Sequence, residues 1–246
     1  MFKIFKWLII YLIVSILLLL MPAFFITDVN LLTNFYLKYQ LLYALIIAII
    51  FIPLLIRQYK KINIKEKKLN NIFYIILIGI TLSIFYNGVM FYLNKYFHFT
   101  NLYENSNNLY ISLISSGIIG PIIEELLFRG IIYNNLKTRY PVMKSIIITT
   151  LVFSLLHFNI IETLYALILG FILIYVYEKY KNIKAPIVLH ITSNIISSLF
   201  VIFLLNTSFL INYILIIISI ILLIFIQTKV KYDIIMNKGE CLWISM

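Results

Sequence analysis

The sequence predicts an all-α fold, a polytopic integral membrane helix bundle with about eight transmembrane helices. Of the 246 residues, 63% are hydrophobic and only 12% are charged, and the mean hydropathy is +1.04. Apolar runs alternate with short polar segments along the chain. A soluble domain has roughly 45–50% apolar residues, and a disordered chain combines low hydrophobicity with high charge density. The composition therefore excludes both classes.

Eight apolar runs divide a single transmembrane domain, residues 1–246, into predicted helices. The first run opens with Lys3 and Lys6 like a signal sequence. It is too long for one and lacks a small-x-small cleavage site, so we interpret it as an uncleaved helix. The fifth run reaches only about 21 Å at 1.5 Å per residue and fails to cross a core of about 30 Å. The predicted spans are residues 4–25, 40–56, 71–93, 109–133, 145–158, 162–177, 186–205 and 209–226.

Basic residues predict the orientation of these helices. Of the 20 Lys and Arg residues, 17 lie at the amino end or in every second loop, which the positive-inside rule assigns to the cytoplasm. An even number of spans then leaves both termini cytoplasmic in a multi-pass protein. The formal charge of +11 is spread between apolar runs and forms no soluble basic surface, so no nucleic-acid partner is expected. The single cysteine, Cys241, cannot close an intramolecular disulfide.

The fourth run carries three charged residues, Glu124, Glu125 and Arg129, in a segment where each lipid-facing charge costs about 2.5–3.5 kcal/mol. Glu125 and Arg129 are four residues apart on one helical face, which favours an ion pair. Glu124 points elsewhere and is free to act as a general base. The alternative is a helix end that snorkels to the cytoplasm with its acids paired to basic groups. Pro121 predicts a local break, which is either a path for water or a kink that only aids packing.

Two histidines and an asparagine lie in other spans at a similar depth. His157 ends the short fifth run, and His190 and Asn194 are four residues apart in the seventh. Counted from the cytoplasmic helix ends, Glu124 and these three residues lie about 8–18 Å deep, which predicts one shared layer.

Two further ionisable residues are interpreted as unrelated to this layer. His98 lies in a polar loop. Glu162 is expected at a helix amino end, where the dipole favours an acid.

Together these residues resemble the CAAX-protease and bacteriocin-processing family of intramembrane endopeptidases, also called the Abi family. The resemblance covers roughly residues 117–194. It implies peptide-bond hydrolysis in which the first glutamate and the first histidine hold a nucleophilic water, while the second histidine and the asparagine face the oxyanion. Three motifs carry it, namely Glu-Glu-x-x-x-Arg (Glu124, Glu125, Arg129), Phe-x-x-x-His (Phe153, His157) and His-x-x-x-Asn (His190, Asn194).

The resemblance leaves the activation of water open. Family members are also described as metalloproteases, and Glu124, His157 and His190 would offer three ligands to zinc with water in the fourth position. Glu125 would then serve as the base. Metal-free and zinc-bound water are both compatible with the sequence.

We therefore predict an intramembrane endopeptidase with a catalytic core at about residues 109–205, acting on a membrane-associated peptide or protein in the lipid bilayer of a bacterial plasma membrane. Bacteriocin maturation, immunity or peptide-signal processing are the expected roles. One alternative is a CAAX-type prenyl-protein protease. Another is a transporter or non-catalytic adaptor with a buried relay. The sequence contains neither repeat halves nor a central carboxylate in a later span that would favour this second alternative.

Overall fold

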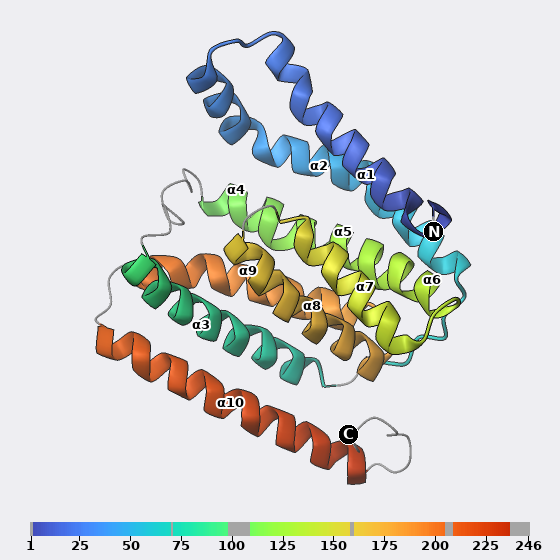
Figure 1. Cartoon of the computed structure of the whole chain (residues 1–246), viewed down its shortest axis with the longest axis vertical. Coiled ribbons are helices and arrows are strands. Elements are labelled where there is room, and N and C mark those ends of the chain that lie inside the picture. The colour runs from blue at the N-terminus through green and yellow to red at the C-terminus, as the bar shows by residue number, and fades with distance from the viewer. Residues whose placement is uncertain (1, 70, 98–108, 158–159, 205–208, 237–246) are drawn as a thin grey trace.

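The computed structural model describes residues 2–69, 71–97, 109–157, 160–204 and 209–236, and these residues form helices and short connections without a strand. Figure 1 shows the bundle. All eight predicted membrane helices are present, which confirms the fold class. Their bounds are α1 (Phe2–Leu20) with the short η1 (Met21–Phe24), α2 (Val29–Lys61), α3 (Ile72–Phe97), a fourth helix from α4 (Leu109–Ile114) to α6 (Asn134–Lys137), α7 (Val142–Leu155), α8 (Ile160–Tyr180), α9 (Lys184–Leu204) and α10 (Phe209–Met236).

The second helix is longer than the hydropathy predicts. It begins at Val29 and not at residue 40, because Asp28 caps its amino end and accepts a hydrogen bond of 2.8 Å from the Leu31 N–H. A capping acid satisfies an otherwise unpaired donor and starts a helix even where the next residues are partly polar. The resulting helix of 33 residues is about 50 Å long and exceeds the thickness of a bilayer core.

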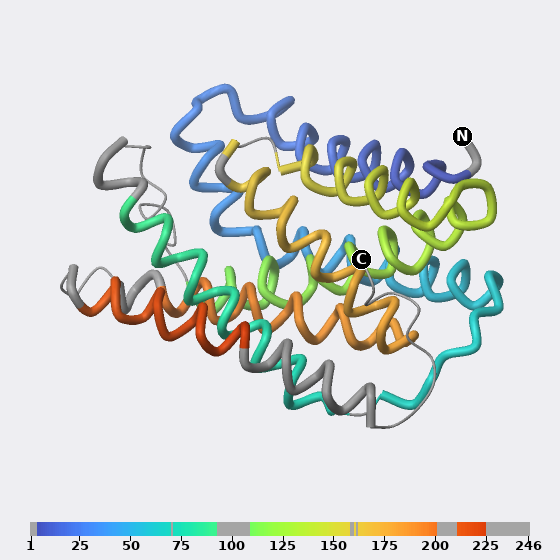
Figure 2. Tube along the Cα trace, turned by 60° about the horizontal axis from the view of Figure 1, so that its bottom comes forward, coloured from blue at the N-terminus to red at the C-terminus, as the bar shows by residue number. Residues whose placement is uncertain are grey.

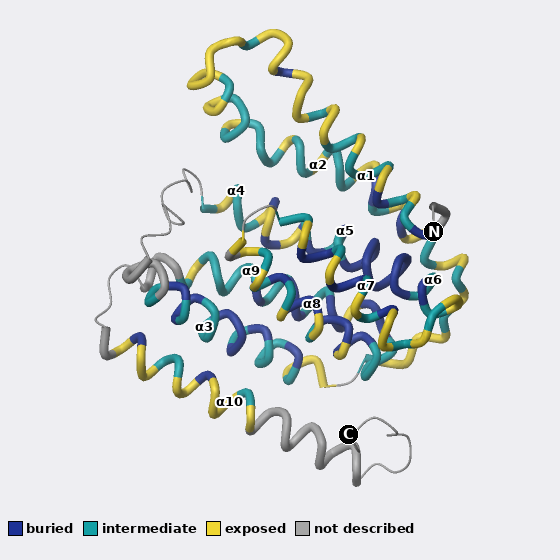
Figure 3. The backbone as a smooth tube through the Cα atoms, viewed as in Figure 1, coloured by how far each residue is buried: buried dark blue, intermediate teal, exposed yellow. Residues whose placement is uncertain are grey.

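Helices α1 and α2 form a hairpin whose tip projects away from the other helices (Figure 1). Figure 3 shows that the tip is largely exposed, and Phe24 and Phe25 are each 82% exposed. Large apolar side chains on the outside are stable in lipid and not in water. Among the described residues, five helices are long and apolar enough to cross a membrane. The chain is therefore a multi-pass membrane protein.

The fourth helix contains two π-helical segments, η2 (Ser115–Ile119) and η3 (Leu126–Tyr133), on either side of α5 (Gly120–Glu125). The Gly120 N–H donates to the Ser115 carbonyl, five residues back. Pro121 follows at the start of α5, where its missing N–H is tolerated. The predicted break therefore takes the form of a widened turn. Such π segments are common at functional sites.

Helix α9 packs against α3, α8 and the fourth helix, while α10 lies on the outer side of α3. Figure 2 shows the same arrangement from another direction. Small residues bring α3 and α9 close: a Cβ on Gly79 would lie 2.9 Å from the Thr192 Cβ. Ser83 also donates to the Ser193 carbonyl at 2.6 Å. Close backbones and interhelical hydrogen bonds are the usual means of helix association in lipid.

The amino end of α1 and the loops after α2, α6 and α8 lie at one end of the bundle (Figure 1). These are the basic segments of the sequence, so their alternation is reproduced in space. The side of the membrane that this end faces stays a prediction.

Candidate active site

A buried ion pair between Glu125 and Arg129 lies beneath the site and supports it. Arg129 Nη1 donates to Glu125 Oε1 at 2.7 Å, and neither side chain has exposed surface. Arg129 Nη2 donates to the Gly170 carbonyl at 3.1 Å, and the guanidinium lies 4.5 Å above the Phe153 ring. The predicted ion pair is confirmed. The alternative in which the helix end snorkels to water is wrong, because the arginine is fully enclosed.

His190 on α9 joins this pair through a contact that spans 65 positions of the sequence. Its Nδ1 lies 2.8 Å from Glu125 Oε1, the same oxygen that accepts from Arg129. A carboxylate oxygen accepts hydrogen bonds, so Nδ1 carries the proton. The other ring nitrogen, Nε2, is then directed toward Glu124 and lies 3.9 Å from its Oε2. Glu125 therefore orients the imidazole of His190 from behind.

Phe153 on α7 is the aromatic centre of the site. Its ring makes edge-to-face contacts with Phe128 at 5.1 Å, with His157 at 5.2 Å and with His190 at 6.0 Å between centroids. Edge-to-face geometry is the preferred arrangement of aromatic pairs and adds about 0.5–1.5 kcal/mol for each pair. One side chain thus positions both histidines as well as the guanidinium of Arg129.

His157 follows the end of α7, which is as short as predicted at 14 residues. Its Nδ1 lies 3.2 Å from the Phe153 carbonyl oxygen, one of the groups that a helix end leaves without an intrahelical partner. A carbonyl oxygen can only accept, so Nδ1 donates and Nε2 presents a lone pair. His157 therefore supplies a proton acceptor to the site.

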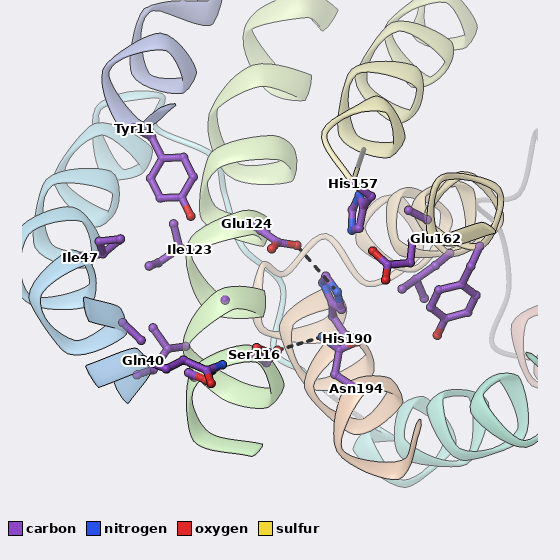
Figure 4. Close-up of a pocket in the computed structure, with 17 residues that line it drawn as sticks. Tyr11, Gln40, Ile47, Ser116, Ile123, Glu124, His157, Glu162, His190 and Asn194 are labelled. Carbon is purple, nitrogen blue, oxygen red and sulfur yellow. Dashed lines mark hydrogen bonds and ion pairs between the residues drawn. The ribbon is translucent and has the colours of Figure 1, made fainter. Parts of the chain in front are cut away.

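A cavity of about 620 Å³ lies between the hairpin, the fourth helix, α8 and α9. Figure 4 shows its lining. Four residues that the sequence places in one layer, Glu124, His157, His190 and Asn194, all line it. Glu124 is 31% exposed, unlike the enclosed Glu125. The structure thus divides the adjacent acids into one that faces the cavity and one that supports His190.

Asn194 lies one turn beyond His190 on α9. Its Nδ2 donates to the Ser116 carbonyl at 3.0 Å, a carbonyl within the π segment η2. A carboxamide carries two N–H bonds, so one remains available after this contact. The widened turn of the fourth helix thus holds the amide at the cavity wall.

The cavity lining also includes residues that sequence reasoning did not assign to the site, among them Tyr11, Gln40 and Glu162. Glu162 does lie in the first turn of α8, as predicted, but its side chain also lines the cavity, which the sequence does not indicate. Gln40 donates to Ser115 Oγ at 3.0 Å. A polar residue at the edge of an apolar run is a weak signal for Gln40, and nothing in the sequence marks Tyr11. His98 lies outside the described residues.

The predicted zinc ligands do not form a coordination site in this geometry. Among the residues that the structure describes, no group of three or more His, Cys, Asp or Glu side chains is arranged to hold a metal ion. The Nε2 of His190 and Oε2 of Glu124 are 3.9 Å apart. The donor types of Glu124, His157 and His190 suit zinc, and the zinc-bound alternative stays a prediction.

The fold and the site define a class: a polytopic helical membrane protein with a buried Glu–Arg–His cluster beside a polar cavity. Residues 106–196 match the family described as "Type II CAAX prenyl endopeptidase Rce1-like". This segment runs from the start of the fourth helix into α9 and contains all three motifs. The resemblance to the CAAX-protease family is thereby confirmed over these residues.

A stretch of 84 residues is 31% identical to "Putative membrane peptidase YdiL" of Bacillus subtilis (strain 168). The match covers 34% of this chain and 34% of that protein, so it spans about a third of the curated relative. No solved structure matches the chain significantly.

Proposed function

We propose that the protein is an intramembrane endopeptidase that hydrolyses a peptide bond in a membrane-associated peptide or protein. The observation that carries the proposal is the convergence of Glu124, His157, His190 and Asn194 on one cavity within an apolar bundle. Peptide hydrolysis needs a base for water and donors for the oxyanion in a site of low polarity. The family match over residues 106–196 supports the same activity.

The attacking water is activated by Glu124 with His157. Glu124 is the acid that Arg129 does not neutralise directly, and its carboxylate faces the cavity. The lone pair on His157 Nε2 orients one hydrogen of the water, while Glu124 accepts the other. The oxygen attacks the peptide carbonyl carbon, and the proton held by Glu124 then moves to the departing amine as the C–N bond breaks. Protons and charge balance over the cycle.

The oxyanion is held by Asn194 and His190. The second N–H of the Asn194 amide remains after its bond to Ser116. His190 donates from Nε2 in its doubly protonated form, in which Nδ1 still donates to Glu125 at 2.8 Å. The two donors lie one helical turn apart on α9 and address the same carbonyl oxygen.

The substrate enters as a peptide held in or at the bilayer, because the site lies among membrane helices. We assign the enzyme to bacteriocin maturation, immunity or peptide-signal processing in a plasma membrane, with both termini cytoplasmic as the basic loops indicate. Cleavage of prenylated CAAX-type proteins is the second candidate, and the family description favours it.

The test is cleavage of membrane-tethered fluorogenic peptides by the purified protein, with bacteriocin-type leaders and prenylated peptides in one panel. We expect Glu124→Gln to reduce cleavage at least about 10³-fold, since general base catalysis and water positioning are lost together. Asp28→Asn removes a carboxylate far from the cavity and keeps the helix cap, so it serves as the matched control. Full activity of the Glu124→Gln protein would contradict the assignment of the base.

A further inference from the structure

Glu162 is a carboxylate in the cavity for which the proposed reaction has no use. It lies in the first turn of α8 and is exposed to the cavity, on the side that holds His157 and His190 (Figure 4). Glu162 lies eighteen positions before the end of α8 at Tyr180, which places it about 27 Å along the helix axis from the basic loop there. This distance keeps Glu162 away from the lysines at that end of the bundle, which pair with Glu178.

The charges around the cavity are unequal. Arg129 and Glu125 neutralise each other below its floor. The described lining includes two carboxylates, Glu124 and Glu162, and neither Lys nor Arg. His190 is the basic group beside Glu124, at 3.9 Å. The carboxylate of Glu162 is therefore the charge that the lining leaves without a cation.

The helix dipole explains the tolerance of an acid at this position but not its direction. An acid in the first turn of a helix gains about 0.3–1 kcal/mol at low ionic strength, wherever its side chain points. The cavity lining supplies neither Lys nor Arg, so the field of its two carboxylates favours a cation there. A cation in the cavity restores the balance through charge-assisted hydrogen bonds.

We propose that Glu162 is a specificity-determining residue that binds a cationic group of the substrate, a Lys or Arg side chain or an ammonium group, close to the scissile bond. The inference rests on the proposed function, since it names the substrate class of the same cavity. A substrate carboxylate at this place is repelled. The selected substrates are thus basic peptides in or at the membrane.

The experiment uses the full-length protein in detergent and membrane-tethered peptides that differ at one position near the cleaved bond, which holds Lys, norleucine or Glu. We expect the wild type to cleave the Lys peptide with a kcat/KM at least about tenfold above the norleucine peptide, the range of one charged hydrogen bond. Glu162→Gln should remove this preference through KM and change cleavage of the norleucine peptide less than about twofold. Glu162→Lys should transfer the preference to the Glu peptide.

Equal losses on all three peptides in the Glu162→Gln protein overturn the inference, because they indicate a structural or general catalytic role. Equal cleavage of all three by the wild type overturns it as well. Asp28→Asn is again the charge-matched control.

A binding measurement separates this inference from the proposed function. The same peptides are titrated onto Glu124→Gln protein with and without Glu162→Gln, so that affinity is read without turnover. Tighter binding of the Lys peptide that depends on Glu162 supports the charge selectivity even where the wild type cleaves nothing, an outcome that defeats only the proteolytic proposal. Binding without any charge preference overturns the inference even if the peptides are cleaved.

Discussion

The Nδ1 atom of His190 lies 2.8 Å from Oε1 of Glu125, and this contact ties α9 to the fourth helix at the wall of the cavity. The same oxygen accepts from Arg129 at 2.7 Å, so one buried carboxylate serves two donors. The two adjacent acids therefore have different tasks. Glu124 faces the cavity, and Glu125 contacts His190 without lining the cavity.

This contact predicts different results for two substitutions of Glu125. Glu125→Ala leaves Arg129 buried without a counter-charge, a change that costs about 3–5 kcal/mol, so we expect a large fall in the thermal unfolding temperature in detergent. Glu125→Gln keeps an oxygen acceptor and should remain folded, with kcat/KM reduced about 10–100-fold because a charged hydrogen bond to His190 is lost. Wild-type cleavage by a folded Glu125→Gln protein would show that the contact does not serve the reaction.

A second prediction concerns the aromatic centre of the site. Phe153→Leu retains an apolar side chain but loses the edge-to-face contacts with His157 and His190 and the face that Arg129 covers. We expect a loss of about 1–3 kcal/mol in stability and about a tenfold fall in kcat. Phe171→Leu on the exposed side of α8, where the side chain is 40% exposed, is the control and should change neither. Equal behaviour of the two variants contradicts the positioning role of Phe153.

The elements that the sequence predicts best are those that depend on local spacing. Glu125 and Arg129 are four residues apart on one helix, so their pairing follows from helix geometry alone. The shortness of α7 follows from hydropathy in the same way and brings His157 inside the membrane. Capping is also local, yet hydropathy places Asp28 in a loop well before the second span and does not predict the early start of α2.

The contacts between distant helices could not be predicted, because apolar faces in lipid carry no signal for which neighbour they meet. The bond between Glu125 and His190 is one example. The cavity is another, since Tyr11 and Gln40 reach it from the hairpin. The helix dipole already explains an acid in the first turn of α8, so the sequence gives no further signal at Glu162. Only the packing of α8 against its neighbours brings this side chain to the cavity.

The close approach of α3 and α9 gives a third prediction. Gly79→Ala would place a Cβ 2.9 Å from the Thr192 Cβ and 3.0 Å from the Leu189 carbonyl oxygen, so the helices must separate. We expect a cost of about 1–3 kcal/mol, measured as a lower unfolding temperature. Gly117→Ala is the matched control because its Cβ would meet Ile195 at 3.4 Å, an ordinary contact. Both substitutions gain the same helix propensity, so the difference between their unfolding temperatures measures the cost of the close contact between α3 and α9.

A fourth prediction separates the two ways of activating water. Among the described residues, no three His, Cys, Asp or Glu side chains are arranged to hold a metal ion. We therefore expect chelation by EDTA or phenanthroline to leave the cleavage rate unchanged. Metal analysis of the same preparation should give less than one zinc per chain. Stoichiometric zinc, with activity that is lost on chelation and restored by added zinc, would instead assign water activation to the metal. Glu125 could not then be the base that the sequence allows for, because its side chain is enclosed and does not line the cavity.

The last prediction concerns Asn194, whose Nδ2 donates to the Ser116 carbonyl at 3.0 Å. If the second N–H of this amide holds the oxyanion, Asn194→Ala should lower kcat about 10²–10³-fold with little change in KM, the usual effect of removing one oxyanion donor. Asn194→Asp should be at least as damaging, because a carboxylate repels the oxyanion.

A purely structural role of Asn194 leads to another result. Loss of the bond to Ser116 would loosen the fourth helix from α9, so the unfolding temperature would fall and KM would rise together with the loss in kcat. The fall in unfolding temperature and the rise in KM therefore distinguish the two roles. Ser198→Ala is the control for both: the Ser198 hydroxyl donates to the Asn194 carbonyl at 2.9 Å, and its removal leaves the amide side chain in place. We expect this variant to keep its rate within about twofold, because the bond that it removes involves the backbone carbonyl of Asn194 and not the side-chain amide that is proposed to hold the oxyanion.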